Sequence, residues 1–333
     1  MATQATEREI AVVGVIGAGQ MGSGIAQLAA AAAGCVVLLL DSDTAALSRA
    51  VASISSSLRR LVAKGQLSQA SYEDSIERIK CVSSVQELCD ADLVIEAIVE
   101  SEDIKKKLFV ELDKITKPSA ILASNTSSIS ITRLASATNR PCQVIGMHFF
   151  NPPPIMKLIE IIRGADTSEE VFTKVKYFSE RLGKMIICSQ DYPGFIVNRI
   201  LMPMINEAFW ALYTGVATKE DIDTGMKLGT NHPMGPLQLA DFIGLDVCLS
   251  VLGVLHNGLG DSKYSPCPLL VQYVDAGRLG KKRGQGVYSY GTRSSSIKPR
   301  SNIDTSSYAF ETIGDCRPGL DYVNKYSGKM AGG

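Results

Sequence analysis

The chain has 333 residues, of which 45% are hydrophobic and 20% are charged. Its 34 Lys and Arg are matched by 34 Asp and Glu, so the formal net charge at pH 7 is zero. Binding to nucleic acid or to an anionic membrane surface depends on a surplus of basic residues, so this balance argues against both partners. The length favours two or three domains, because single hydrophobic cores seldom serve more than about 250–300 residues.

Membrane and targeting signals are weak. The longest nearly apolar stretch covers residues 25–40, whereas a spanning helix needs about 20 apolar residues, so we expect no membrane span. The first nine residues resemble neither a signal peptide nor an Arg-rich, acid-poor transit peptide, and the chain does not end in Ser-Lys-Leu. We therefore expect a soluble intracellular protein, cytoplasmic or peroxisomal.

The eight cysteines include no Cys-x-x-Cys pair, and most of them lie in apolar runs. We expect reduced thiols in the core, and neither a disulfide framework nor a metal site. The histidines are only three, His148, His232 and His256. The last two fall at predicted helix boundaries, where capping or packing explains them, so His148 is the main candidate for a general base.

Short apolar runs alternate with helical patterns over residues 1–191, as is typical of a doubly wound α/β sheet. The sequence predicts strands at 11–16, 36–40, 93–98, 121–123, 144–147, 157–162 and 185–188. It predicts helices at 21–33, 45–63, 104–115 and 129–137. A helical hairpin over residues 42–80 is expected as an insertion after the second strand. We therefore predict a Rossmann-like dinucleotide-binding domain over residues 1–191.

The pattern changes after residue 191. A Pro-Gly pair at 193–194 is followed by helical patterns at 195–213, 219–228, 245–255 and 269–276. These patterns predict an all-α C-terminal domain over residues 192–290. Residues 291–333 are rich in Ser, Gly and Pro and show no clear periodicity, so we expect a flexible tail there.

The strongest local motif is Gly17-Ala18-Gly19-Gln20-Met21-Gly22, between the first predicted strand and the first predicted helix. The first glycine permits a tight turn, the second lets the backbone approach a pyrophosphate, and the third lets helix and strand pack closely. The helix N-terminus would then face the phosphates. The turn predicts a dinucleotide site with cofactor contacts from Gly17, Gly19, Gln20, Met21 and Gly22.

An acidic residue follows at the spacing that such a site requires. The second predicted strand ends at Asp41, about 20 residues beyond the glycines. A carboxylate there can accept hydrogen bonds from the adenine ribose and would repel a 2′-phosphate, so the sequence predicts NAD and not NADP. No Gly-x-x-x-x-Gly-Lys-Ser/Thr loop occurs, which argues against ATP hydrolysis.

Polar clusters follow two predicted strands where hydride chemistry is expected. Residues 124–128 read Ser-Asn-Thr-Ser-Ser, and His148 opens the run His-Phe-Phe-Asn-Pro. Glu160 stands alone in the apolar run 158–162, where a carboxylate is costly unless it has a partner. A histidine base oriented by a carboxylate suits the oxidation of a secondary alcohol by NAD. The alternatives are a structural histidine and a helix N-cap at 124–128.

In this setting the chain resembles the 3-hydroxyacyl-CoA dehydrogenase family, especially the single-function type called 3-hydroxybutyryl-CoA dehydrogenase. The resemblance covers residues 10–290. It is carried by GxGxMGxGIA at 17–26, DLVIEAIVE at 92–100, ASNTSSISIT at 123–132, GMHFFNPPPIMKLIE at 146–160, DYPGFIVNRIL at 191–201, KEDIDTGMKLG at 219–229, HPMGPLQLAD at 232–241 and GKKRGQGVYSY at 280–290.

The resemblance implies a reversible, NAD-dependent oxidation of an L-3-hydroxyacyl-CoA to the 3-ketoacyl-CoA in fatty-acid metabolism. A short chain such as 3-hydroxybutyryl-CoA is the expected substrate. His148 would be the general base, paired with Glu160, while Ser127 and Asn198 would bond the substrate oxygens. The family pattern assigns further cofactor contacts to Glu100, Lys105 and Asn151.

The resemblance also implies roles for two helical segments. The hairpin over 42–80 would help to hold coenzyme A, with Arg59, Arg60 and Lys64 as candidate diphosphate contacts. A solvated charged face explains these residues equally well. A homodimer through the C-terminal helical domain is expected, with the helix at 195–213 as a candidate interface; burial in the domain core is the competing explanation.

Three alternatives remain open from the sequence. The L-gulonate 3-dehydrogenase and lambda-crystallin group acts on a sugar acid, but the Pro-Gly-Phe-Ile-Val-Asn-Arg block fits the acyl-CoA group better. A β-hydroxyacid dehydrogenase shares the glycine turn but works with a lysine on its helical domain. A non-catalytic structural relative is disfavoured because the whole predicted constellation is present. No crotonase-like domain is present, which argues against a complete multifunctional β-oxidation protein.

Overall fold

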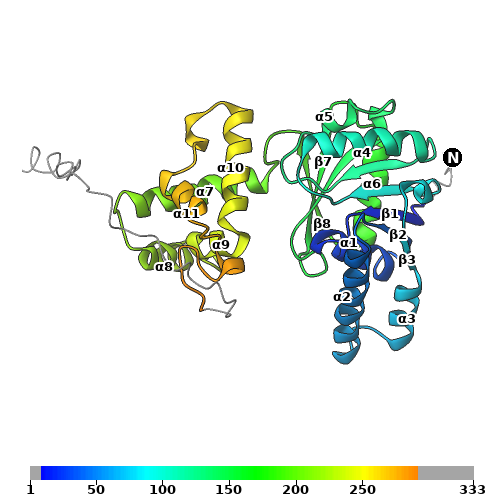
Figure 1. The fold of residues 1–333 in the computed structure, drawn as a ribbon, viewed down its shortest axis with the longest axis horizontal. Coiled ribbons are helices and arrows are strands. Elements are labelled where there is room, and N and C mark those ends of the chain that lie inside the picture. Colours follow the sequence, from blue (N-terminus) through cyan, green and yellow to red (C-terminus); the bar gives the residue numbers. More distant parts are fainter. Residues whose placement is uncertain (1–8, 292–333) are drawn as a thin grey trace, which may run out of the picture. The chain divides into compact units, whose positions relative to one another are not determined.

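The computed structural model describes residues 9–291 (Figure 1). Apart from Gly291, the predicted tail lies outside the described residues. Within them an eight-stranded sheet has the order β3-β2-β1-β4-β5-β6-β7-β8. The strands are β1 Val12–Ile16, β2 Val36–Leu40, β3 Ile79–Val82, β4 Leu93–Glu96, β5 Ile121–Ser124, β6 Val144–Phe149, β7 Leu158–Arg163 and β8 Met185–Gln190.

Helices cover both faces of the sheet because its strands are apolar on both sides. Leu93 and Ile95 of β4 pack into one core cluster, and the intervening Val94 packs into the other. The first cluster includes α1 (Gln20–Ala31), α2 (Thr44–Ala63) and α6 (Glu169–Arg181). The second includes α4 (Glu102–Ile115) and α5 (Ile131–Ala135). The predicted doubly wound α/β class is confirmed.

The expected helical hairpin is formed by α2 and α3 (Gln69–Glu77), which lie side by side in Figure 1. The Asp43 carboxylate accepts a hydrogen bond from the Ala45 amide at 2.8 Å and caps the start of α2. Ser68 caps α3 in the same way through the Ser71 amide. The hairpin packs against α1, which places α2 beside the glycine-rich turn.

The last two strands run opposite to the first six. Strand β7 pairs antiparallel with β6, and β8 is parallel to β7. Only residues 150–157 join β6 to β7, whereas a parallel crossover needs about a dozen residues or more. The short connection therefore forces a reversal, and the edge of the sheet departs from an all-parallel arrangement.

Three elements were missed by the sequence patterns. Strand β3 is a four-residue edge strand that contains Lys80, so it has no continuous apolar run. Helix α6 is amphipathic over 13 residues and had a readable signal, with Val171, Val175 and Phe178 buried on one face. Helix α9 (Pro236–Ile243) has only eight residues and starts on proline, so its pattern resembles a loop.

A separate core cluster forms among the helices beyond residue 196. They are α7 Val197–Tyr213, α8 Lys219–Gly229, α9, α10 Leu245–Leu259 and α11 Pro268–Asp275. Residues 280–290 fold back onto Asp241, which is 1% exposed and accepts hydrogen bonds from the Val287 and Tyr288 amides at 2.9 Å. The Tyr290 hydroxyl donates a third bond at 3.0 Å. The Asp241 carboxylate therefore holds residues 280–290 against α9.

The prediction of core cysteines is wrong for four of the seven cysteines described. Cys35, Cys248 and Cys267 are buried, but the remaining four are exposed: Cys81, Cys89, Cys142 and Cys188. All seven are free thiols. Cys81 and Cys188 lie in the edge strands β3 and β8, and Cys89 and Cys142 lie in connections between strands. In such places an apolar neighbour in sequence does not imply burial. Cys316 lies outside the described residues.

No single helix among residues 9–291 is long and apolar enough to cross a membrane. The consecutive helices α9 and α10 meet the criteria of length and composition only as a pair, and their axes bend by 98°.

The Asp241 anchor gives a graded prediction for stability. We expect Tyr290→Phe to lower the free energy of unfolding by about 1 kcal/mol, since it removes one hydrogen bond. Asp241→Ala leaves two amides and the hydroxyl without their acceptor and should cost about 3 kcal/mol or more. Urea unfolding followed by the fluorescence of Trp210, the single tryptophan, measures both because this residue lies in α7. Equal losses in the two variants would contradict the assignment.

Candidate active site

The glycine-rich turn joins β1 to α1 and leaves room for a ligand. Gly17 has φ +101°, and a Cβ on Gly22 would fall 1.7 Å from the Gly17 carbonyl oxygen. Both positions therefore require glycine for the turn itself. Gly19 differs, because a Cβ there would meet nothing within 4 Å. It is the N-cap of α1 and has no side-chain cap, so the first amides of the helix are available to an anion.

Asp41 lies directly beside this turn at the carboxyl end of β2. Its Oδ2 accepts a hydrogen bond from the Ala18 amide at 2.7 Å, and its Oδ1 accepts one from the Asp43 amide at 2.9 Å. The Gly17 amide donates to the Leu40 carbonyl at 2.8 Å. Asp41, the residue predicted to bind the adenine ribose, therefore lies next to the glycine-rich turn predicted to bind the pyrophosphate. Its hydrogen bond from the Ala18 amide also holds that turn in place.

The antiparallel register of β6 and β7 sets His148 directly opposite Glu160. The His148 Nδ1 and Glu160 Oε2 atoms are 2.6 Å apart, and both residues are buried. In the neutral tautomer whose Nδ1 donates to the Glu160 carboxylate, Nε2 is the acceptor nitrogen of the ring. The ring centroids of Phe150 and Phe195 lie 4.7 and 5.7 Å from the centroid of the imidazole, so the two phenyl rings cover its sides.

The second oxygen of Glu160 extends the site to the start of the helical region. Oε1 accepts hydrogen bonds from the Ile196 amide at 3.1 Å and the Val197 amide at 3.0 Å, where α7 begins. Asn198 is the next residue of α7 and is half-buried. One carboxylate therefore orients the histidine ring and anchors the turn that carries Asn198.

Ser127 completes the group from the turn after β5. Its hydroxyl oxygen lies 3.2 Å from His148 Nε2. The Ser127 amide donates to Glu100 Oε1 at 2.9 Å, and the same oxygen accepts from Thr126 Oγ1 at 2.5 Å. Asn125 Oδ1 accepts from the Phe149 amide at 2.9 Å, which ties this turn to the end of β6. The structure thus brings together Ser127, His148 and Glu160.

An ionic cluster with a buried lysine lies behind the Ser127 turn. Lys105 is 1% exposed, and its Nζ lies 2.5 Å from Glu96 Oε1 and 3.2 Å from Glu100 Oε2. The other oxygen of Glu96 accepts from Ser124 Oγ at 2.6 Å. Sequence reasoning singled out Glu100 and Lys105 but missed Glu96. The signal was present, since Glu96 is a lone carboxylate closing an apolar strand, as Glu160 is within one.

Asn151 is exposed in the loop that follows β6, and the Asn151–Pro152 peptide bond is cis. The loop alone sets the position of Asn151. Gln20 and Met21 open α1 directly after the glycine turn, with Gln20 exposed.

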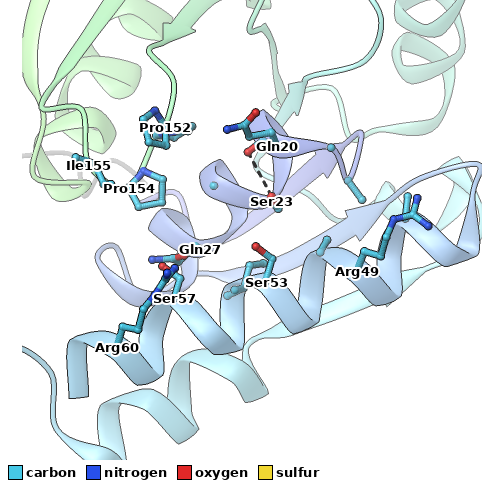
Figure 2. Close-up of a pocket in the computed structure, with 17 residues that line it drawn as sticks. Gln20, Ser23, Gln27, Arg49, Ser53, Ser57, Arg60, Pro152, Pro154 and Ile155 are labelled. Carbon is cyan, nitrogen blue, oxygen red and sulfur yellow. Dashed lines mark hydrogen bonds between the residues drawn. The ribbon is translucent and has the colours of Figure 1, made fainter. Parts of the chain in front are cut away.

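A cavity of about 520 Å³ lies between the glycine turn, α2 and the loop of residues 152–155. Figure 2 shows Arg49, Ser53, Ser57 and Arg60 projecting from one face of α2 toward this space. Of the basic residues predicted on the hairpin, only Arg60 lines the cavity; Arg49, at its other end, was missed.

Two other predicted basic residues lie elsewhere on the hairpin. The Arg59 guanidinium donates to the Tyr72 hydroxyl at 3.1 Å and stacks over that ring, which ties α2 to α3. Lys64 forms the C-cap of α2 and is exposed. The helical periodicity separates Arg59 from Arg60 by about 100°, so neighbours in sequence face different sides.

The site has the features of a dinucleotide-dependent oxidoreductase: a phosphate-binding turn, an acidic residue at the end of β2 and a carboxylate-oriented histidine. Residues 12–192 match the family model of the 3-hydroxyacyl-CoA dehydrogenase NAD binding domain. Residues 194–290 match that of the 3-hydroxyacyl-CoA dehydrogenase C-terminal domain. The chain therefore belongs to the 3-hydroxyacyl-CoA dehydrogenase family of NAD-dependent oxidoreductases.

Individual relatives agree with this assignment. The chain is 55% identical to a 3-hydroxybutyryl-CoA dehydrogenase of Bradyrhizobium diazoefficiens over 84% of its own length and 94% of the relative. It is 42% identical to the human mitochondrial hydroxyacyl-coenzyme A dehydrogenase, over 84% and 90% of the two chains. The crystal structure of (S)-3-hydroxybutyryl-CoA dehydrogenase from Ralstonia eutropha matches with a TM-score of 0.83 and 50% identity, covering 85% of this chain and all of that one.

The ionisation of Glu100 makes the site's stability depend on pH. Burial opposes its charge, but the Lys105 ammonium and the hydrogen bonds from Thr126 and Ser127 outweigh burial and lower the pKa of this carboxyl below 4.5. A carboxyl with a lowered folded-state pKa contributes stability above its unfolded pKa and loses it as the pH falls through the folded one.

We therefore expect Glu100→Gln to destabilise the protein at neutral pH and to lose that effect as the pH falls below 4.5. Urea unfolding of the ligand-free protein between pH 7 and about pH 3 measures the difference, because the loss begins only below the unfolded pKa of 4.5. Glu180→Gln, a charge change at an exposed residue of α6, is the matched control. A constant difference between wild type and Glu100→Gln over this range would contradict the proposed ionic role.

Proposed function

We propose that this protein is a short-chain L-3-hydroxyacyl-CoA dehydrogenase that reversibly oxidises substrates such as 3-hydroxybutyryl-CoA to 3-ketoacyl-CoA, with a role in β-oxidation. The observation that carries the proposal is the buried His148–Glu160 pair, with the Ser127 hydroxyl oxygen 3.2 Å from His148 Nε2. His148 lies on β6, which neighbours β5 and the Ser127 turn that follows β5, and Glu160 lies opposite it on β7. The relatives named above support the acyl-CoA substrate.

In this mechanism His148 moves the proton. Its Nε2 takes the proton of the 3-hydroxyl in oxidation and returns it to the 3-keto oxygen in reduction. Glu160 holds the ring through Nδ1 and stabilises the imidazolium that forms, as the carboxylate does in other histidine–acid pairs. Ser127 and Asn198 donate hydrogen bonds to the substrate oxygens, where negative charge develops.

The residues present fit NAD. Open space at Gly19 and the uncapped start of α1 suit the pyrophosphate, and the Asp41 carboxylate suits an unphosphorylated ribose. Gln20, Met21, Glu100, Lys105 and Asn151 are the further contacts that we propose. Bound NAD supplies the hydride acceptor for C3 of the substrate.

We place the coenzyme A portion of the substrate in the cavity beside α2. Arg49 and Arg60 stand at its two ends, with Ser53 and Ser57 between them on the same helical face (Figure 2). Guanidinium groups favour phosphate oxygens, and serine hydroxyls can bond the amides of the pantetheine arm. The cavity supports Arg60 over the other predicted hairpin residues, Arg59 and Lys64.

We further propose a division into a dinucleotide-binding domain over residues 1–191 and a helical substrate and dimerisation domain over residues 192–290.

A homodimer through the helical domain is supported by exposed apolar side chains there, such as Val216, Leu228 and Phe242. Sedimentation analysis at several protein concentrations tests the proposed homodimer.

We propose a cytoplasmic location because several of the relatives are bacterial proteins. The peroxisomal location stays a prediction.

A substrate comparison tests the proposed function. We expect NADH oxidation with acetoacetyl-CoA to exceed that with long 3-ketoacyl-CoAs by about tenfold or more in kcat/KM, since pocket fit changes with each methylene. NADPH should replace NADH poorly because Asp41 repels the 2′-phosphate. A dehydrogulonate-type substrate serves as the control for the sugar-acid alternative. Preference for that substrate would overturn the proposal.

The proposed base gives a second prediction. His148→Gln should lower kcat by about 10²–10⁴-fold, because the variant cannot exchange the proton. The Kd of NADH, measured by fluorescence, should change little. His256→Gln at the end of α10 is the matched control and should keep wild-type turnover. Near-normal turnover in His148→Gln would remove the assignment of the base.

A further inference from the structure

Lys184 is a buried lysine that the proposed mechanism does not use. It follows the end of α6, where Gly183 adopts φ +71° and turns the chain toward β8. Lys184 is 9% exposed, and its Nζ donates to the Pro153 carbonyl at 2.6 Å and the Met156 carbonyl at 2.7 Å. Among residues 9–291 no carboxylate forms an ion pair with it.

The loop that accepts these bonds has few donors of its own. Pro152, Pro153 and Pro154 have no amide hydrogen, so this segment cannot form a backbone ladder. The Pro152 carbonyl accepts from the Ile155 and Met156 amides at 3.0 Å. The carbonyls of Pro153 and Met156 accept hydrogen bonds from Lys184 instead, so this lysine holds the loop at two points three residues apart.

This loop forms a wall of the cavity. Pro152, Pro154 and Ile155 face α2 across the space in Figure 2, opposite Arg60 and Ser57. The loop also packs tightly on α1, since a Cβ on Gly24 would lie 2.9 Å from Pro153 Cγ. The distance between the proline wall and α2 therefore depends on where the loop is held.

Keeping an ammonium in this position is costly. Burial lowers the pKa of Lys184, because removing the charge from water disfavours the protonated form. Charge-assisted hydrogen bonds to two carbonyls offset that cost and are stronger than neutral ones. A methionine would fill similar space but would leave both carbonyls without a donor.

We propose that Lys184 is a positioning residue that fixes the proline wall of the cavity and so sets the affinity for the coenzyme A portion of the substrate. The inference rests on the proposed function, because that function places coenzyme A in this cavity. Lys184 acts through the carbonyls of Pro153 and Met156 and not on the reacting atoms. Its removal should therefore change KM for the full thioester more than kcat.

The test compares acetoacetyl-CoA with the truncated thioester acetoacetyl-N-acetylcysteamine, which lacks the nucleotide. In Lys184→Met we expect KM for acetoacetyl-CoA to rise about tenfold, with kcat within about twofold and the truncated thioester unaffected. Lys184→Arg keeps the charge and the donors and should recover part of the affinity. If Lys184→Met does not fold, Lys184→Gln carries the same test, since its shorter amide cannot reach both carbonyls.

Lys176→Met, at an exposed position on α6, is the matched control and should behave as wild type. Equal losses with both thioesters, or no change with either, would overturn the role of Lys184. The double variant Arg49→Ala, Arg60→Ala tests the coenzyme A cavity separately. If it leaves KM for acetoacetyl-CoA unchanged while Lys184→Met raises it selectively, the two arginine contacts on α2 fail, and the proline wall of the same cavity still sets the affinity for coenzyme A.

Discussion

The reversal of the chain between β6 and β7 is the constraint on which the site depends. A parallel crossover would have carried Glu160 away from His148, whereas the short connection sets the two residues opposite each other in an antiparallel register. One carboxylate oxygen then fixes the histidine tautomer, and the other holds the first amides of α7. The position of the base and the start of the helical region are therefore consequences of one strand pairing.

Several charges are buried in this protein, and each is held by more than one partner. Desolvation of a charge costs several kcal/mol, so a buried charge persists only where hydrogen bonds and opposite charges offset that cost. Lys105 lies between two carboxylates behind the Ser127 turn. Lys184 bonds two carbonyls of a proline-rich loop that lacks its own donors. Both lysines lie under loops that line the site, which is where rigid positions are required.

Much of the fold was predictable because its signals are local. The glycine turn, Asp41 and the apolar strands follow from neighbouring residues, and His148 and Glu160 were found as polar residues in apolar surroundings. Glu96 carried the same signal and was missed. Arg49 and Arg60 could not be separated from Arg59 without knowing which face of α2 meets α1. The prediction for the exposed cysteines was wrong because an apolar run in an edge strand or a connection does not ensure burial.

The sequence by itself determined the class of fold, the phosphate-binding turn and the residue types of the site, because hydrophobic periodicity and glycine geometry act over a few residues. Tertiary structure alone decided which residues meet. The 2.6 Å approach of Glu160 to His148, the cluster around Lys105 and the grip of Lys184 on the proline loop each join segments from different elements. Such contacts depend on strand order and register, which the whole core sets and no short pattern records.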